Sequence, residues 1–76
     1  MITGAQIKEA RRLLQWAPRD LASKARVRTT IVQRAEATDG EPALTLAQAN
    51  AIQRALEDAD VEFTNSEPGV KLRKQA

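Results

Sequence analysis

The chain has 76 residues, enough for one domain with a small hydrophobic core. Its 12 basic and 10 acidic side chains give a net charge of +2, which is compatible with nucleic-acid binding but does not require it. Cysteine, histidine and tyrosine are absent, so disulfides, the usual metal ligands and the usual general base are missing. We therefore expect no enzymatic activity, no metal and no cofactor. Without an apolar run of membrane-spanning length or a signal peptide, we also expect a soluble protein of a reducing compartment.

The first predicted helix begins near Gly4. Thr3 is a good N-cap, and Gln6 follows it at the spacing of a capping box. Trp16 closes this helix, and we interpret it as a lid over the core rather than as a base-stacking residue. The apolar stripe that faces the core comprises Ile7, Ala10, Leu13, Leu14 and Ala17.

The stretch from Pro18 to Glu36 predicts two short helices joined by a tight turn near Arg26. Proline suits the first turn of a helix, where its missing N–H has no helical partner. The third helix is predicted from Thr29 to Ala37, and a run of turn-forming residues follows it. The apolar positions of the two helices and their turn are Leu21, Ala22, Ala25, Val27, Val32 and Ala35.

Thr45 and Gln48 have the spacing of a second capping box, which predicts a fourth helix. The alternation of apolar and charged residues then predicts a C-terminal β-hairpin over about residues 61–72, with Glu62 opposite Lys71. The last four residues should fray. The sequence thus predicts a mainly α domain over residues 1–76, with four helices and a short hairpin. The buried stripe predicted for the fourth helix is Leu46, Ala49, Ile52, Leu56 and Ala59.

The two central helices resemble the helix-turn-helix of the Xre/Cro phage-repressor type. The resemblance covers roughly Thr3 to Ala59 and implies a four-helix, repressor-like domain with its helix-turn-helix at about residues 18–36. It also implies an ion pair between Arg11 on the first helix and Glu36 at the end of the third. The residues that match the family pattern are Leu21, Ala22, Ala25, Val27, Val32, Arg34, Ala35 and Glu36.

In that family, one face of the third helix enters the major groove of DNA. Gln33 could read adenine there, and Arg28 could read guanine or hold a phosphate. Phosphate or rim contacts could come from Arg19, Lys24 and Arg26. The face that would contact DNA or protein comprises Arg28, Thr29, Thr30, Ile31, Gln33 and Arg34.

Several positions depart from the family pattern. Pro18 replaces a glutamine that helps to hold a phosphate, and proline offers neither an N–H nor a side-chain donor. Ala17 replaces a serine, Arg26 replaces a glycine in the turn, and Arg28 replaces the serine that would cap the third helix. Ile31 falls at an outward position, where we expect it to be exposed. An exposed isoleucine could meet a thymine methyl group or form the centre of a protein contact.

The scaffold residues are therefore kept, whereas several residues that would position the domain on DNA are changed. We favour a domain that binds and blocks another transcription regulator, because the sequence also resembles the small antiactivators of conjugative elements. The alternative is an Xre/Cro-type repressor that binds operator DNA. Either function implies the bacterial cytoplasm and a monomer or weak homodimer, with regulation by occupancy alone.

Overall fold

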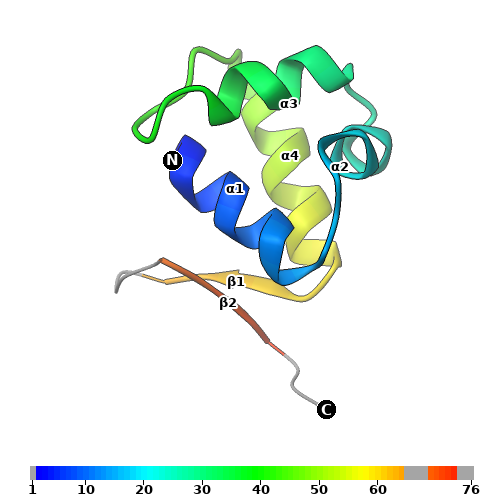
Figure 1. The fold of residues 1–76 in the computed structure, drawn as a ribbon, viewed down its shortest axis with the longest axis vertical. Helices are drawn as coiled ribbons and strands as arrows, with labels where there is room; N and C mark the ends of the chain where they lie inside the picture. Colours follow the sequence, from blue (N-terminus) through cyan, green and yellow to red (C-terminus); the bar gives the residue numbers. More distant parts are fainter. Residues whose placement is uncertain (1, 65–68, 74–76) are drawn as a thin grey trace.

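The computed structural model describes residues 2–64 and 69–73 of the chain. It contains four helices followed by an antiparallel hairpin, which confirms the predicted mainly α fold (Figure 1). The elements are α1 (Gly4–Leu13), α2 (Pro18–Ala25), α3 (Thr29–Glu36), α4 (Leu46–Asp58), β1 (Val61–Phe63) and β2 (Val70–Leu72). Most of the predicted hairpin loop, Thr64–Gly69, and of the predicted frayed end, residues 73–76, lies outside the described residues. The expectation that Arg73 frays is wrong, because its N–H donates to the Asp60 carbonyl at 2.6 Å.

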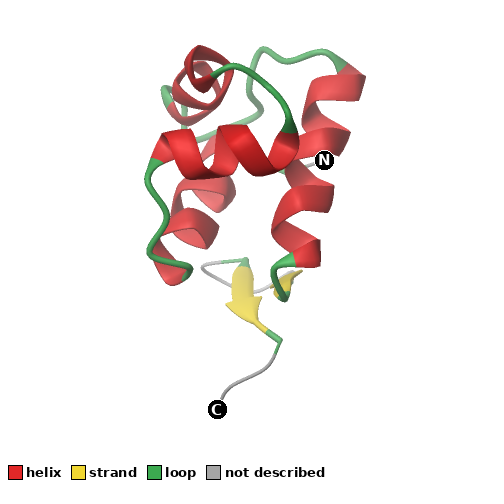
Figure 2. Cartoon of the chain, turned by 90° about the vertical axis from the view of Figure 1, so that its right-hand side faces the viewer, coloured by secondary structure: helices red, strands yellow, loops and turns green. Residues whose placement is uncertain are grey.

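The helices pack around one core, and the hairpin lies across one end of the helical layer (Figure 2). All four helices and β1 contribute a large, fully buried apolar side chain, so burial of apolar surface holds the elements together. No helix among the described residues is long and apolar enough to cross a membrane. The largest fully buried side chains are Ile7, Leu21, Ile52, Leu56, Val32 and Val61.

Both predicted capping boxes are present. The Thr3 hydroxyl accepts a hydrogen bond from the Gln6 N–H at 3.1 Å, and the Gln6 side chain accepts one from the Thr3 N–H at 2.8 Å. Thr45 and Gln48 make the same two bonds at 3.1 and 3.0 Å. Each box satisfies backbone donors that a helix start leaves without partners, so α1 and α4 begin where the sequence predicts.

Gly4 lets the start of α1 meet the end of α3. A β-carbon at this position would overlap the carbonyl oxygens of Ala35 and Thr38. The Gly4 N–H also donates to the carbonyl of Gly40 at 2.8 Å, in the loop that follows α3. The missing side chain therefore allows a close approach of backbone to backbone that any other residue would block.

The turn between α2 and α3 begins at Arg26, as predicted. Arg26 has φ 59° and ψ 43°, in the left-handed region. Its N–H donates to the Ser23 carbonyl at 3.3 Å, and the Val27 N–H donates to the Ala22 carbonyl at 3.0 Å. These two bonds form a Schellman motif, which stops α2 and turns Val27 back to pack against the core.

Two predicted helix ends differ from the structure. α1 ends at Leu13, before Trp16, because Gln15 has φ 58° and the Trp16 N–H donates to the Arg11 carbonyl at 2.9 Å. A second Schellman motif thus closes α1 one turn early. Trp16 is half-buried against the core, in agreement with its interpretation as a lid. α3 ends at Glu36, and Ala37 is its C-cap.

The prediction that Leu46 is buried is wrong, since this side chain is 65% exposed. The buried face of α4 centres on Ile52 and Leu56. At 3.6 residues per turn, Leu46 is rotated well away from that centre. Ala59 is only half-buried, at the other end of the predicted stripe.

The hairpin has the predicted register. Val61 faces Leu72, Glu62 faces Lys71 and Phe63 faces Val70. Val61 is completely buried, which anchors the hairpin against the helices. The charged pair lies across the two strands, where opposite charges favour pairing.

Candidate functional site

The predicted Arg11–Glu36 pair is present and positions α3. Arg11 donates from Nε and Nη2 to the two carboxylate oxygens of Glu36, at 2.8 and 2.9 Å. Its Nη1 donates to the Trp16 carbonyl at 2.7 Å. The hydrogen bonds to Glu36 raise the pKa of the Arg11 guanidinium. The pair therefore joins α1, the turn after it and the last residue of α3. The opposite face of α3 points away from the core.

Four polar side chains of the predicted contact face are exposed on α3 or at its N-cap. Thr29, in contrast, is half-buried, while the inward positions are filled by Val32 and Ala35. Within the described part of the chain, the four exposed side chains make no hydrogen bond or ion pair. They are thus available to a ligand. These side chains are Arg28, Thr30, Gln33 and Arg34.

The expectation that Ile31 is exposed is wrong. Ile31 is half-buried and packs against the core. Gln48, on the first turn of α4, lies beside it, and the two residues line a shallow hollow of about 560 Å³. We call this the Ile31 hollow, and its lining comprises Arg26, Val27, Arg28, Ile31 and Gln48.

The start of α2 lacks the features of an anion site. Pro18 is its first residue, and the N-cap, Ala17, has no side chain that can form a hydrogen bond. The Asp20 carboxylate accepts from the Ala17 N–H at 2.8 Å. A negative charge thus already occupies the helix end that would otherwise attract a phosphate.

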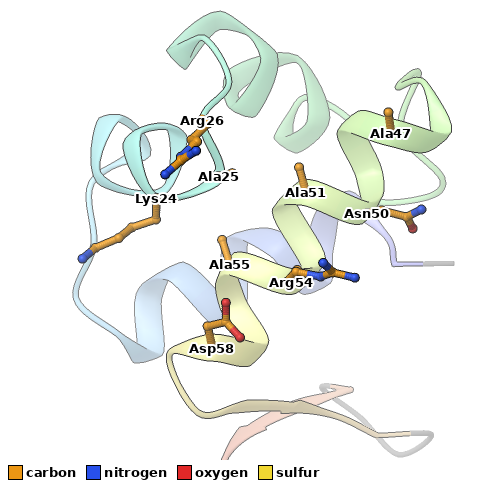
Figure 3. Close-up of a pocket in the computed structure, with 9 residues that line it drawn as sticks. All are labelled: Lys24, Ala25, Arg26, Ala47, Asn50, Ala51, Arg54, Ala55 and Asp58. Carbon is orange, nitrogen blue, oxygen red and sulfur yellow. The ribbon is translucent and has the colours of Figure 1, made fainter.

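A second depression runs between α2 and α4 (Figure 3). We call it the α2–α4 groove, and its volume is about 480 Å³. Alanines form much of its lining, and Lys24 and Arg26 stand on its α2 side. Arg26 also borders the Ile31 hollow, so the two depressions meet at this residue. The groove is lined by Lys24, Ala25, Arg26, Ala47, Asn50, Ala51, Arg54, Ala55 and Asp58.

No protein-family model, curated protein or solved structure matches the chain. Among the described residues, no group of three or more histidine, cysteine, aspartate or glutamate side chains is placed to hold a metal ion. The interpretation of function therefore depends on the surface of the domain itself.

The predicted site residues divide into separate surfaces. Arg28 and Ile31 meet at the Ile31 hollow, whereas Lys24 lies in the α2–α4 groove. Arg19 is exposed but lines neither depression. Sequence reasoning missed the groove. Its one signal was the recurrence of alanine every four residues on α4, which places these small side chains on one face.

Proposed function

We propose that this chain is a small transcription regulator that binds another transcription regulator and blocks it. The observation that carries the proposal is the Ile31 hollow. Its lining combines the apolar side chains of Ile31 and Val27 with the polar side chains of Arg26, Arg28 and Gln48. Apolar side chains next to polar ones that include arginine are the composition of a protein-binding hot spot.

The start of α2 supports protein as the ligand rather than DNA. In the repressor family that the sequence resembles, this helix end holds a phosphate. Here Pro18 has no N–H to donate, and the carboxylate of Asp20 lies in the first turn. A phosphate placed there would lose a hydrogen bond and meet a like charge, so this end of α2 disfavours the DNA complex.

The geometry suggests a simple mechanism of inhibition. An apolar side chain of the partner enters the Ile31 hollow, while the guanidinium of Arg28 makes forked hydrogen bonds to a carboxylate or carbonyl beside it. The bound domain then covers a surface that the partner needs for its own activity. Such a partner works in the bacterial cytoplasm, and we place this protein there.

Operator binding is the second candidate function. The exposed side chains on the outer face of α3 favour it, because they make no internal hydrogen bonds among the described residues. Gln33 can pair with adenine, and Arg34 can reach a phosphate or a base edge. In this mode a dimer would act as an Xre/Cro-type repressor on a palindromic site.

Two assays on matched variants separate the two functions. A two-hybrid screen pairs the chain with the transcription regulators of its source cell, and a gel-shift assay uses the DNA upstream of its own coding sequence. The variants are Gln48→Glu, which changes the Ile31 hollow, and Gln33→Ala, which changes only the outer face of α3. Glutamate keeps the acceptor that Thr45 requires in the capping box, so the helix start is preserved.

We expect the wild-type chain to capture a regulator. Gln48→Glu should weaken that complex by about tenfold or more, because the new carboxylate competes for the guanidinium of Arg28 and repels a carboxylate of the partner. Gln33→Ala should leave the complex unchanged. Capture of no regulator, together with a specific and salt-sensitive gel shift that Gln33→Ala abolishes, would instead establish the operator-binding function.

A further inference from the structure

The charged side chains that line the α2–α4 groove are mostly cations. Lys24 and Arg26 stand on its α2 side, and Figure 3 shows Arg54 on the side of α4 away from α2. Asp58 is the one carboxylate in the lining. All four side chains are exposed, and within the described part of the chain none of them forms an ion pair or a side-chain hydrogen bond. The cations are therefore available to carboxylates of another molecule.

The groove also accounts for the positive excess of the whole protein. Three cationic side chains and one carboxylate give its lining a net charge of +2, which equals the net charge of the 76-residue chain. The charged side chains elsewhere in the chain therefore balance one another. An acidic ligand is attracted to the groove more than to the rest of the surface, because the uncompensated charge is gathered there.

Between the charged side chains, the groove is lined by small apolar ones. Ala47, Ala51 and Ala55 recur every four residues on α4, and Ala25 of α2 joins them (Figure 3). Side chains as short as these allow the backbone of another helix to approach closely. A helix with small or apolar side chains along one face can thus pack against this row of alanines.

An apolar hollow continues the groove beside Trp16. We call it the Trp16 hollow, and its volume is about 210 Å³. Lys24, Ala55 and Asp58 line both depressions, so the two are continuous. The indole is half-buried, and a large apolar side chain placed against its exposed part would be removed from water. The lining residues of the hollow are Trp16, Lys24, Ala55, Asp58 and Ala59.

These features favour an acidic helix of a protein over nucleic acid as the ligand. The alanines and the indole offer apolar contacts, which a sugar–phosphate backbone does not use for positioning. Asp58 would repel a continuous row of phosphates. A helix can avoid that repulsion, because it needs carboxylates only at the positions that face the cations.

We propose that the α2–α4 groove docks an acidic amphipathic helix of another protein. The small apolar face of that helix packs along Ala51 and Ala55, and one larger apolar side chain enters the Trp16 hollow. Carboxylates beside this face pair with Lys24 and Arg54. Because the cations are exposed, each ion pair is weak and sensitive to salt, and the complex is reversible.

Amide NMR titrations of the full chain with two synthetic peptides test the proposal. Both peptides are alanine-based helices of about 18 residues with one leucine, and they differ only in carrying glutamate or lysine at the same positions. We expect the glutamate peptide to shift the amide signals of Ala51 and Ala55, with a dissociation constant on the order of 1 mM or below. The lysine peptide should shift neither signal.

Charge variants with opposite expected effects locate the contact. Lys24→Glu and Arg54→Glu should each raise the dissociation constant of the glutamate peptide by about fivefold or more. Lys8→Glu is the matched control, because Lys8 is exposed on α1 and lines neither the groove nor either hollow. It should change the constant by less than about twofold. Asp58→Asn should lower the constant by about twofold or more, since it removes the repelling carboxylate, and such a gain cannot result from unfolding.

Four results would each overturn the proposal. The first is no shift with the glutamate peptide at millimolar concentration. The second is equal weakening by Lys8→Glu and Lys24→Glu, which would indicate a general attraction between opposite charges. The third is a short DNA duplex that shifts the amide signals of the groove when the glutamate peptide does not, and the fourth is a shift of these signals on dilution of the chain alone, which would assign the groove to a second copy. The experiment needs no regulator, so its result is independent of the proposed function.

Discussion

Arg11 holds both carboxylate oxygens of Glu36, at 2.8 and 2.9 Å, across the interface of α1 and α3. The two side chains are 19% and 9% exposed, so the pair is largely shielded from solvent. The third bond of the same guanidinium, to the Trp16 carbonyl, adds the turn after α1 to the contact. A shielded pair of this kind fixes geometry, because either charge without the other is poorly solvated.

We therefore expect Arg11→Ala to lower the free energy of unfolding by about 1–3 kcal/mol. Arg12→Ala is the matched control, because Arg12 pairs with Glu9 on the exposed surface of α1. Arg12→Ala should lower the free energy of unfolding by much less than Arg11→Ala does. Urea denaturation of the two variants measures the difference. Equal losses would show that the Arg11–Glu36 pair contributes no more than an exposed one.

The register of α3 is tested by two neighbouring residues. Val32 is completely buried, and Val32→Ala should reduce stability by about 1–3 kcal/mol through lost burial and a cavity. Ile31→Val removes one methylene group from a half-buried side chain and should cost less than about 1 kcal/mol. The same urea experiment compares them. A larger loss for Ile31→Val would contradict the orientation of α3.

The features that the sequence predicted best are those that depend on local spacing. The capping boxes at Thr3 and Thr45 need only a hydroxyl and a glutamine three residues later. The hairpin register follows from the alternation of apolar and charged residues around Glu62 and Lys71. The stop at Arg26 was also predicted, since the apolar pattern breaks there.

The features that the sequence missed depend on contacts between distant segments. Ile31 is half-buried because it packs against a core to which the other helices contribute, and the periodicity of one helix contains no information about those neighbours. The α2–α4 groove likewise forms between two separate helices, and its lining includes Lys24 from one and Ala51 from the other. The error at Leu46 has a different cause, because this first residue of α4 is rotated well away from Ile52 and Leu56, the centre of the buried face.

Arg26 adopts a backbone conformation that favours glycine, with φ 59° and ψ 43°. Arg26→Gly should therefore increase the free energy of unfolding by about 0.5–1 kcal/mol, because the relief of strain exceeds the added entropy of the unfolded chain. Arg19→Gly is the matched control within α2, where glycine should instead reduce stability by about 0.5–1 kcal/mol. Thermal unfolding at micromolar concentration would detect the opposite signs. Two losses of similar size would show that the left-handed turn carries no strain.

Arg28 occupies the N-cap position of α3, but its side chain does not cap the helix. Its backbone is extended, at φ −73° and ψ 148°, and its side chain makes no capping hydrogen bond. Serine at this position would satisfy a backbone donor at the start of α3. Arg28 lacks this capping hydrogen bond, but it lines the Ile31 hollow. We infer that arginine at this position serves binding at the expense of stability.

We thus expect Arg28→Ser to change stability and binding in opposite directions. The free energy of unfolding should rise by about 0.5–1 kcal/mol, because serine caps α3. Capture of the partner regulator in the two-hybrid assay should weaken, because the forked donor at the rim of the hollow is lost. Thr3→Ala is the control with the reverse pattern: it removes a cap on α1 and should reduce stability by about 1 kcal/mol without an effect on capture. If Arg28→Ser is more stable but still captures the partner regulator as well as the wild-type chain does, Arg28 is not part of the interface.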